Sequence, residues 1–333
     1  MKEKIMYTDV TELEKRMASK RHQTFPLNVI IEPGNYCNLN CITCTNNQIK
    51  RKRGNMNVLL YKKIIDEIAE ENPYTRIWLD YYGEPLLQKF KLYYFIDYAK
   101  TKGVKNICIN TNGTLLDEEM TEMLLDSGID FISIDCDGFS AEVYEKIRVN
   151  AKRDVVYKNI EYLLERKKFY QNRGADIPII EVKAMEMQEN KHEIQKIMDY
   201  WRMKGAWTTK RRLISWAGVL KDLEPDADIK RVACANGIGI LAITWDGLVT
   251  NCVMDVDAEY TCGDVNVQSI KEIWQKRNED LVRKHFEHDW ENLPEICKNC
   301  NDWKIAGEER FDENGNPVNK SYENNEAMLK NDY

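Results

Sequence analysis

Three cysteines near the amino end have a spacing that suits metal chemistry. Cys37, Cys41 and Cys44 are separated by three and then two residues, and they follow residues 27–32, which have the pattern of a buried strand. Their thiolates can therefore converge on one small volume. Iron-sulfur clusters usually have four thiolate ligands, so three indicate a four-iron cluster with one open iron. The alternative is a structural zinc ion, which needs a further Cys or His nearby.

A second set of cysteines lies beyond residue 230. Cys297 and Cys300 form a CxxC pair, and Cys234 and Cys252 flank the segment WDGLV, which is typical of a hairpin. Four thiolates from a hairpin and a distal CxxC complete the coordination of one further cluster. A zinc ribbon is the alternative. Of the remaining cysteines, Cys108 is expected in the core, while Cys136 lies where a strand ends and Cys262 lies in a loop.

Composition excludes several classes of function. The 333 residues carry a net charge of -7, which argues against nucleic-acid binding. No segment has the ~20 apolar residues that span a bilayer, and the charged amino end lacks a secretory apolar region, so we expect no membrane association and a cytoplasmic protein with reduced thiols. We expect the basic run 50–53 to be a solvated loop, with docking of an anionic group or electron donor as the alternative.

Predicted strands and helices alternate along residues 27–215. Strands are expected at 27–32, 75–81, 104–110, 129–135, 177–184 and 207–214, and helices at 56–71, 88–102, 117–127, 140–149, 154–172 and 190–204. Six strand-helix units imply a parallel sheet, either doubly wound or a partial barrel. Both arrangements place ligands at the carboxyl ends of the strands. Residues 216–303 are broken into short segments, and the polar residues 304–333 predict a flexible tail.

The CxxxCxxC motif after the first strand resembles the signature of the radical S-adenosylmethionine (SAM) superfamily. The resemblance implies a partial (β/α)6 barrel at residues 27–215, preceded by an amino-terminal lead at 1–26. It also implies that SAM binds the open iron of a [4Fe-4S] cluster held by Cys37, Cys41 and Cys44. The residue before the third cysteine is usually aromatic in the family, and here it is Thr43.

Later segments resemble the family's SAM-binding motifs in the expected order. YGEP after the second strand resembles GGEP, TNG follows the third strand, and polar residues end the fourth strand. An arginine follows in EKIR, and a methionine lies beyond the fifth strand. The resemblance therefore implies SAM contacts from Gly83, Glu84, Thr111, Asn112, Ser133, Asp135, Arg148 and Met185.

The second cysteine set resembles the shortened SPASM module called twitch, in which one auxiliary [4Fe-4S] cluster has four protein ligands. This places an auxiliary-cluster domain at residues 216–303, with Cys234, Cys252, Cys297 and Cys300 as ligands. The similar enzymes of aminoglycoside pathways imply hydrogen abstraction from a small polar molecule, a sugar or aminocyclitol, and a reducing partner such as flavodoxin or ferredoxin.

Two outcomes of that chemistry stay open. The auxiliary cluster can take an electron, which gives dehydrogenation. Alternatively a thiol, for which Cys262 is the candidate, can return a hydrogen atom, which gives epimerisation. Maturation of a ribosomally made peptide is the alternative function. Aromatic residues at Tyr81, Tyr82, Trp207, Trp216 and Trp245 and acids at Asp255 and Asp257 are candidates for a sugar pocket, with core packing and solvated loops as their alternatives.

Overall fold

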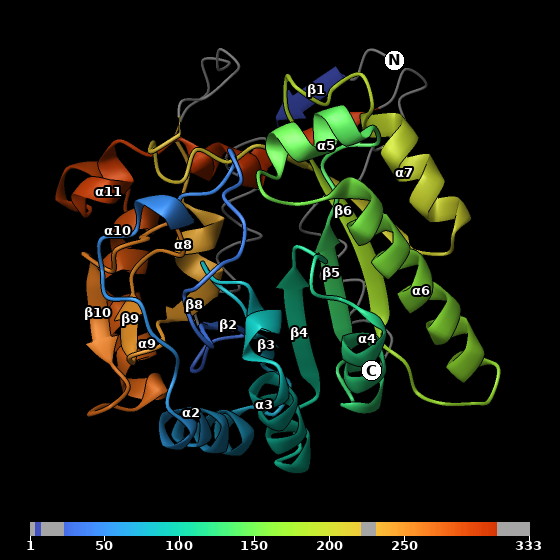
Figure 1. Cartoon of the computed structure of the whole chain (residues 1–333). Helices are drawn as coiled ribbons and strands as arrows, with labels where there is room; N and C mark the ends of the chain where they lie inside the picture. Colours follow the sequence, from blue (N-terminus) through green and yellow to red (C-terminus); the bar gives the residue numbers. More distant parts are fainter. Residues whose placement is uncertain (1–3, 8–22, 221–230, 312–333) are drawn as a thin grey trace.

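One nine-stranded sheet forms the centre of the protein (Figure 1). The computed structural model describes residues 4–7, 23–220 and 231–311. The strand order is β10-β9-β8-β2-β3-β4-β5-β6-β7. Strands β2 to β7 pair in parallel in the order in which they occur in the sequence, so each needs a crossover connection to the next. The sheet ends at β10 and β7 without closing.

The predicted alternation of strands and helices is confirmed. The strands are β2 (Asn28–Ile31), β3 (Arg76–Trp78), β4 (Asn106–Thr111), β5 (Phe131–Asp135), β6 (Ile179–Glu186) and β7 (Trp207–Arg212). The helices are α2 (Val58–Glu71), α3 (Phe90–Thr101), α4 (Glu118–Asp126), α5 (Ala141–Ile147), α6 (Arg153–Gln171) and α7 (Ile194–Met203). Short 3-10 helices η1 (Asn46–Gln48) and η2 (Pro85–Gln88) lie in the loops after β2 and β3.

Strand alternation gives the sheet one apolar and one polar face. In β5, Ile132 and Ile134 belong to the main core with the buried faces of the helices. Ser133 and Asp135 point to the opposite side, where they contact polar residues of β6 and β4. Burial of each such isoleucine contributes about 1.5–3 kcal/mol. The helices therefore cover the outer face, and the inner face of the barrel is left for polar chemistry.

The bottom of the inner face is closed by aromatic residues. Trp78 and Phe131 meet at a ring-centroid distance of 5.7 Å in a T-shaped pair, and the register places Cys108 between them. Cys108 is 3% exposed, which confirms it as a core residue. Polar side chains begin one layer higher, at Asn110 and Ser133. The site therefore lies toward the carboxyl ends of the strands.

Strands beyond residue 230 extend the same sheet. Strand β8 (Ile240–Ile243) pairs in parallel with β2, and β9 (Leu248–Thr250) and β10 (Thr261–Asp264) follow antiparallel. The predicted hairpin is thus β8 and β9, with Gly247 at φ +99° in its turn. The helical segments here are α8 (Ala235–Gly239), α9 (Ile270–Arg277), the π-helix η3 (Asn278–Val282), α10 (Arg283–Phe286), η4 (Trp290–Asn292), α11 (Glu295–Lys298) and η5 (Asp302–Gly307).

The tail is not wholly irregular as the composition predicted. Strand β11 (Glu308–Phe311) pairs antiparallel with β1 (Lys4–Tyr7), so the first part of the tail is joined to the amino-terminal lead. The prediction of a flexible end is wrong for residues 308–311, because pairing between distant segments cannot be read from composition. Residues 312–333 lie outside the described part of the chain.

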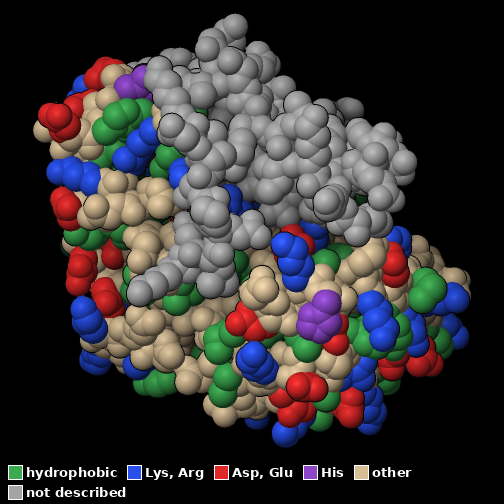
Figure 2. Space-filling model, turned by 90° about the horizontal axis from the view of Figure 1, so that it is seen from above, with side chains coloured by type: hydrophobic (Ala, Val, Ile, Leu, Met, Phe, Trp, Pro, Cys, Tyr) green, Lys and Arg blue, Asp and Glu red, His purple; other side chains and the backbone are tan. Residues whose placement is uncertain are grey.

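The described surface mixes charges of both signs. On the face in Figure 2, acidic and basic side chains are interspersed. Within the described residues, none of the helices combines the length and apolar character that a membrane crossing requires.

Candidate functional site

The loop after β2 holds the first three cysteines close together. Its backbone is fixed by bonds from the amides of Asn40 and Ile42 to carbonyls at the end of α5, at 3.0 and 3.1 Å. Burial is the main cause that raises the pKa of the Cys44 thiol to about 11, and the neighbouring thiols Cys41 and Cys37 add to it. The amide of Asn46 donates to Cys44 Sγ at 3.3 Å.

A glycine and a glutamate from the loop after β3 lie against this cysteine loop. A side chain on Gly83 would collide with the carbonyl oxygen of Gly34, so only glycine permits this close approach. Glu84 is 3% exposed and accepts bonds from Thr111 Oγ1 at 2.7 Å and from the Asn112 amide at 2.9 Å. Burial raises the pKa of Glu84 to about 7.

Arg148 links the cysteine loop to the end of β5. Its Nη1 lies 3.8 Å from Cys41 Sγ, and its Nη2 lies 3.4 Å from Asp135 and 2.6 Å from Asp137. Asp137 also accepts the amide of Met185 at 2.8 Å. Asp137 is fully buried, and we had no sequence signal for it because Asp-Gly is an ordinary turn.

The structure thus brings together seven of the predicted SAM contacts around the cysteine loop, but Ser133 lies deeper. Its hydroxyl donates to Glu181 Oε2 at 2.5 Å, and Thr209 donates to the other oxygen of Glu181 at 2.6 Å. These three residues form a closed hydrogen-bonded layer on the inner face. A role for Ser133 in binding SAM remains a prediction.

The inner face also has polar atoms without partners in the described structure. They are Asp80 Oδ1, Asn110 Oδ1 and Arg211 Nε. Lys183 Nζ lies 3.5 Å from Asp135 on the same face. Burial raises the pKa of Asp80 to about 7, although the charges of Lys183 and Arg211 oppose this. Buried polar atoms are normally paired, so these groups form a cluster of unpartnered polar atoms that suits a polar ligand.

The second cysteine set also converges. The pKa of the Cys252 thiol is raised well above its usual range, first by burial and then by Cys234, Cys297 and Cys300. The amide of Met254 donates to Cys252 Sγ at 3.4 Å, and the amide of Asp302 donates to Cys300 Sγ at 3.3 Å. Amide donors of this kind stabilise thiolates.

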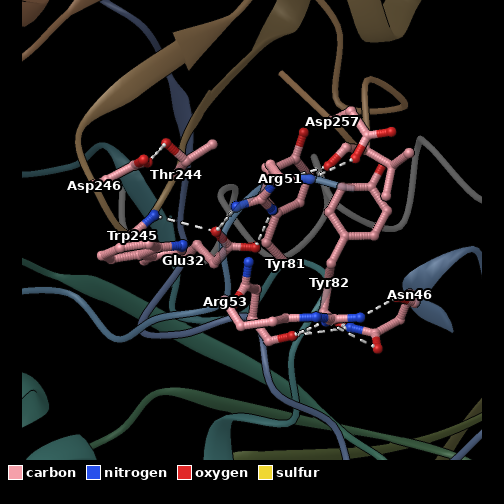
Figure 3. Close-up of polar contacts among 12 residues, drawn as sticks. Glu32, Asn46, Arg51, Arg53, Tyr81, Tyr82, Thr244, Trp245, Asp246 and Asp257 are labelled. Atoms are coloured by element: carbon pink, nitrogen blue, oxygen red, sulfur yellow. Dashed lines mark hydrogen bonds and ion pairs between the residues drawn. The ribbon is translucent and has the colours of Figure 1, made fainter. Parts of the chain in front are cut away.

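The basic run joins the cysteine loop to the segment that bears Cys252. Figure 3 shows Arg51 paired with Glu32 through two bonds of 2.6 and 2.7 Å, and Asp257 accepting the Lys50 and Arg51 amides at 2.6 and 3.1 Å. Arg53 contacts Asn35 and Asn46 in the cysteine loop. The prediction of a solvated loop is therefore wrong for Arg51 and Arg53, whose side chains bind other parts of the protein. The carboxylate of Asp257 is likewise used within the protein.

Aromatic residues fill the space between the two cysteine sets. Tyr82 is 3% exposed, and its hydroxyl donates to the Val253 carbonyl at 3.0 Å. Trp216 packs on Tyr82 at 5.4 Å between ring centroids and donates to the carbonyl of Thr43 at 2.8 Å. Trp245 donates to Lys52, and Trp207 is 43% exposed. Tyr82, Trp216 and Trp245 therefore join the cysteine loop to the later segment.

Two further cysteines have contacts that the sequence did not predict. Cys136 is fully buried and accepts the indole N–H of Trp201 at 3.4 Å beneath α7. Cys262 lies in β10, where its thiol is 3.5 Å from the Val249 carbonyl oxygen. Its charged neighbours are Arg277 and Lys276, so the structure does not group it with the strand-end residues. Hydrogen donation by Cys262 remains a prediction.

Two family models match the parts of the chain that carry these cysteine sets. The radical SAM superfamily model matches residues 31–172, and the SPASM iron-sulfur cluster-binding domain model matches residues 234–301. The chain therefore contains a radical SAM domain and a SPASM iron-sulfur cluster-binding domain. It is 25% identical over 288 residues to the S-adenosyl-L-methionine-dependent 2-deoxy-scyllo-inosamine dehydrogenase of Niallia circulans, which covers 85% of this chain and 95% of the relative.

Solved structures of radical SAM proteins share the fold. BtrN in complex with AdoMet and 2-DOIA aligns with a TM-score of 0.56 at 20% identity, over 82% of this chain and 92% of BtrN. Streptococcus suis SuiB bound to S-adenosylmethionine aligns with a TM-score of 0.62 at 14% identity, over 88% of this chain and 75% of SuiB. The predicted partial (β/α)6 barrel is confirmed.

The cofactors of a radical SAM enzyme with a SPASM domain are two [4Fe-4S] clusters and SAM, as predicted, and the thiols fit them. Zn–S bonds of about 2.3 Å would require sulfur atoms about 3.8 Å apart. In the described ranges, no three Cys, His, Asp or Glu side chains are arranged to hold a single metal ion. Yet the thiols of each set are largely shielded from water and lie close enough to raise one another's pKa. This arrangement suits a larger cluster, whose irons compensate the buried negative charge.

Proposed function

We propose that this radical SAM enzyme dehydrogenates a small polar substrate that carries hydroxyl or amino groups, such as a sugar or aminocyclitol. The observation that carries the proposal is the cluster of unpartnered polar atoms at Asp80, Asn110 and Arg211 on the inner face of the sheet. The dehydrogenase from Niallia circulans, which is similar over most of both chains, supports the reaction class.

The proposal assigns ligands to both clusters. Cys37, Cys41 and Cys44 would hold the SAM-binding cluster, and Cys234, Cys252, Cys297 and Cys300 the auxiliary cluster. Residues 27–215 would form the catalytic barrel and residues 216–303 the auxiliary-cluster domain. The shared sheet joins the two through β2 and β8.

Residues around the cysteine loop would orient SAM. Glu84 would accept a bond from the methionyl amine, since its carboxylate is held by Thr111 and Asn112 beside Cys37. Arg148, near Cys41, would bind the SAM carboxylate. When bound, the cluster and SAM supply a 5′-deoxyadenosyl radical that abstracts a hydrogen atom from carbon.

Oxidation of an alcohol carbon then requires the loss of one proton and one electron. In the proposed reaction Asp80 would accept the O–H proton of the substrate, while bound SAM and the auxiliary cluster would supply the acceptors for the C–H hydrogen atom and for the remaining electron. Asp80 suits the role because its Oδ1 has no partner among the described residues and its pKa of about 7 lies near neutral pH. Lys183 and Arg211 would bind substrate oxygen atoms on the same face.

Anaerobic reconstitution tests the proposal. We expect about eight irons per chain, release of 5′-deoxyadenosine under reductant such as reduced flavodoxin or ferredoxin, and a carbonyl product from a polyol or aminocyclitol. A Cys37→Ala, Cys41→Ala, Cys44→Ala variant should retain about four irons and cleave no SAM. Zinc in place of iron, or intact SAM under strong reductant, would contradict the proposal.

A redox-neutral product would favour epimerisation instead. In that reaction the Cys262 thiol would return a hydrogen atom, and Cys262→Ala would abolish product formation. Modification of a peptide remains the second alternative, and activity on a short precursor peptide encoded by a neighbouring gene would favour it.

A further inference from the structure

Arg277, at the end of α9, is a buried cation without a carboxylate partner. Its side chain is 1% exposed, and none of the ion pairs in the described ranges includes it. Its Nη2 donates to the carbonyls of Gly237, Ile240 and Asn251, the last at 3.0 Å. Its Nε and Nη1 have no partner among the described residues. An uncompensated buried charge costs several kcal/mol, so this arrangement calls for an anion.

The thiols of the auxiliary segment are the negative groups nearest to Arg277. Burial lowers the pKa of Arg277, and the thiolate forms of Cys262, Cys252, Cys234 and Cys297 oppose that change. The carbonyls that bind Nη2 also belong to the cysteine-bearing segments, since Gly237 lies in α8 directly after Cys234 and Asn251 precedes Cys252. Arg277 thus contacts both segments, while its Nε and Nη1 have no partner among the described residues.

Two more side chains with unpartnered nitrogen atoms lie near the cysteines of the auxiliary segment. Arg231 donates to the Cys297 carbonyl at 2.5 Å, and its Nε has no partner within the described chain. His285 is 1% exposed, and both its ring nitrogens lack partners there. A methyl group built on Gly237 would lie 3.5 Å from His285 Nε2 and 3.6 Å from the Cβ of Cys234, so the imidazole is close to that ligand.

Nearby acids do not neutralise these cations. Asp302 uses both carboxylate oxygens to accept the amides of Ser215 and Ala217, at 2.7 and 2.9 Å. Asp255 accepts the amides of Glu259 and Tyr260, at 3.1 and 2.7 Å. Both acids still raise the pKa of thiols in the set. The free N–H groups of the arginines therefore remain available to an anionic cluster.

We propose that Arg277 is the charge-compensating residue of the auxiliary cluster, and that its guanidinium raises the reduction potential of that cluster. The inference rests on the proposed function, because it assumes a cluster at Cys234, Cys252, Cys297 and Cys300. A fixed positive charge favours the form of the cluster with one more electron. Arg277 therefore makes the cluster a better electron acceptor, which is what dehydrogenation requires and epimerisation does not.

The test isolates the auxiliary cluster by removing the three cysteines of the first one. In this background, Arg277→Gln, Arg277→Lys and the control Arg283→Gln are compared by iron content and by a redox titration followed by electron paramagnetic resonance. Arg283 is a suitable control because it is 43% exposed and pairs with Glu287. We expect Arg277→Gln to lower the equilibrium constant for reduction at least tenfold, a shift of about 59 mV for one electron.

The variants separate charge from shape. Arg277→Lys keeps the positive charge, so its reduction potential should lie closer to that of the wild-type background than to that of Arg277→Gln. Arg283→Gln should leave the reduction potential unchanged. An unchanged potential in Arg277→Gln with full iron content would overturn the inference, as would equal loss of iron from both Arg277 variants. Those results would leave the auxiliary cluster itself in place. Failure of the background protein to bind any iron would instead refute the cluster, and the inference with it.

Discussion

The ion pair between Glu32 and Arg51 provides a quantitative test of how the two halves of the protein are joined. Glu32 is 0% exposed and Arg51 is 11% exposed, and two bonds of 2.6 and 2.7 Å connect them. Glu32 also accepts the Trp245 amide at 3.1 Å, and Arg51 donates to the Val256 carbonyl at 2.7 Å. Glu32→Gln would leave the guanidinium buried without its anion.

Breaking a buried pair by removing one partner costs about 3–5 kcal/mol. That loss corresponds to an increase of about 10²- to 10⁴-fold in the unfolding equilibrium constant. With a urea dependence of about 3 kcal/mol per molar, the midpoint of unfolding should fall by about 1–2 M. The measurement is urea unfolding of the cluster-free protein followed by tryptophan fluorescence.

Two variants serve as controls. Glu287→Gln removes the acid of an exposed pair, whose side chains are 43% and 49% accessible, and should cost under about 0.5 kcal/mol. Glu32→Gln combined with Arg51→Met removes both charges and should recover more than half of the lost free energy of unfolding. If Glu32→Gln cost less than about 1 kcal/mol, or if the double variant were no more stable than the single one, the reasoning would fail.

Three further predictions concern the site. Gly83→Ala should lower the iron content of the first cluster and leave the irons of the auxiliary cluster bound, because the added methyl group collides with the Gly34 carbonyl. Equal iron content in Gly83→Ala and the wild-type protein would contradict this. The rate of product formation should rise with pH through about 7, because Asp80 must lose its proton before it can accept one from the substrate. Asp80→Asn should lower kcat at least about tenfold and remove this rise from the pH profile. An unchanged profile in Asp80→Asn would assign the titration to another group. Cys262→Ala should retain both clusters and the oxidised product, as measured by iron content and product analysis, and loss of product with full iron content would instead support epimerisation.

The barrel was predictable because its residues obey local rules. Strands such as β5 and β6 alternate apolar and polar residues, and the helices between them have apolar faces at helical spacing. The boundaries were less certain, and α7 begins at Ile194 rather than at residue 190. The grouping of the cysteines into an early and a late set was predictable from their spacing, and their role as cluster ligands remains a prediction.

Residues whose role depends on tertiary packing were not predictable. Asp137 is buried by Arg148, which comes from a different element, and the sequence around it has the form of a surface turn. Arg277 ends a short helix rich in charged residues, and it is buried against the carbonyls of Gly237, Ile240 and Asn251, which are distant in the sequence. Likewise, the basic run is structural because Glu32 and Asp257 approach it from distant parts of the sequence.

The open form of the sheet has a consequence for the behaviour of the protein at high concentration. A sheet that does not close exposes two edge strands, which are templates for aggregation. Here β10 has four residues and an irregular register between Thr261 and Gly263, and the last residue of β7 is Arg212. Short, bulged or strongly charged edges resist pairing with another chain. The sheet can therefore stay open without promoting pairing with another chain.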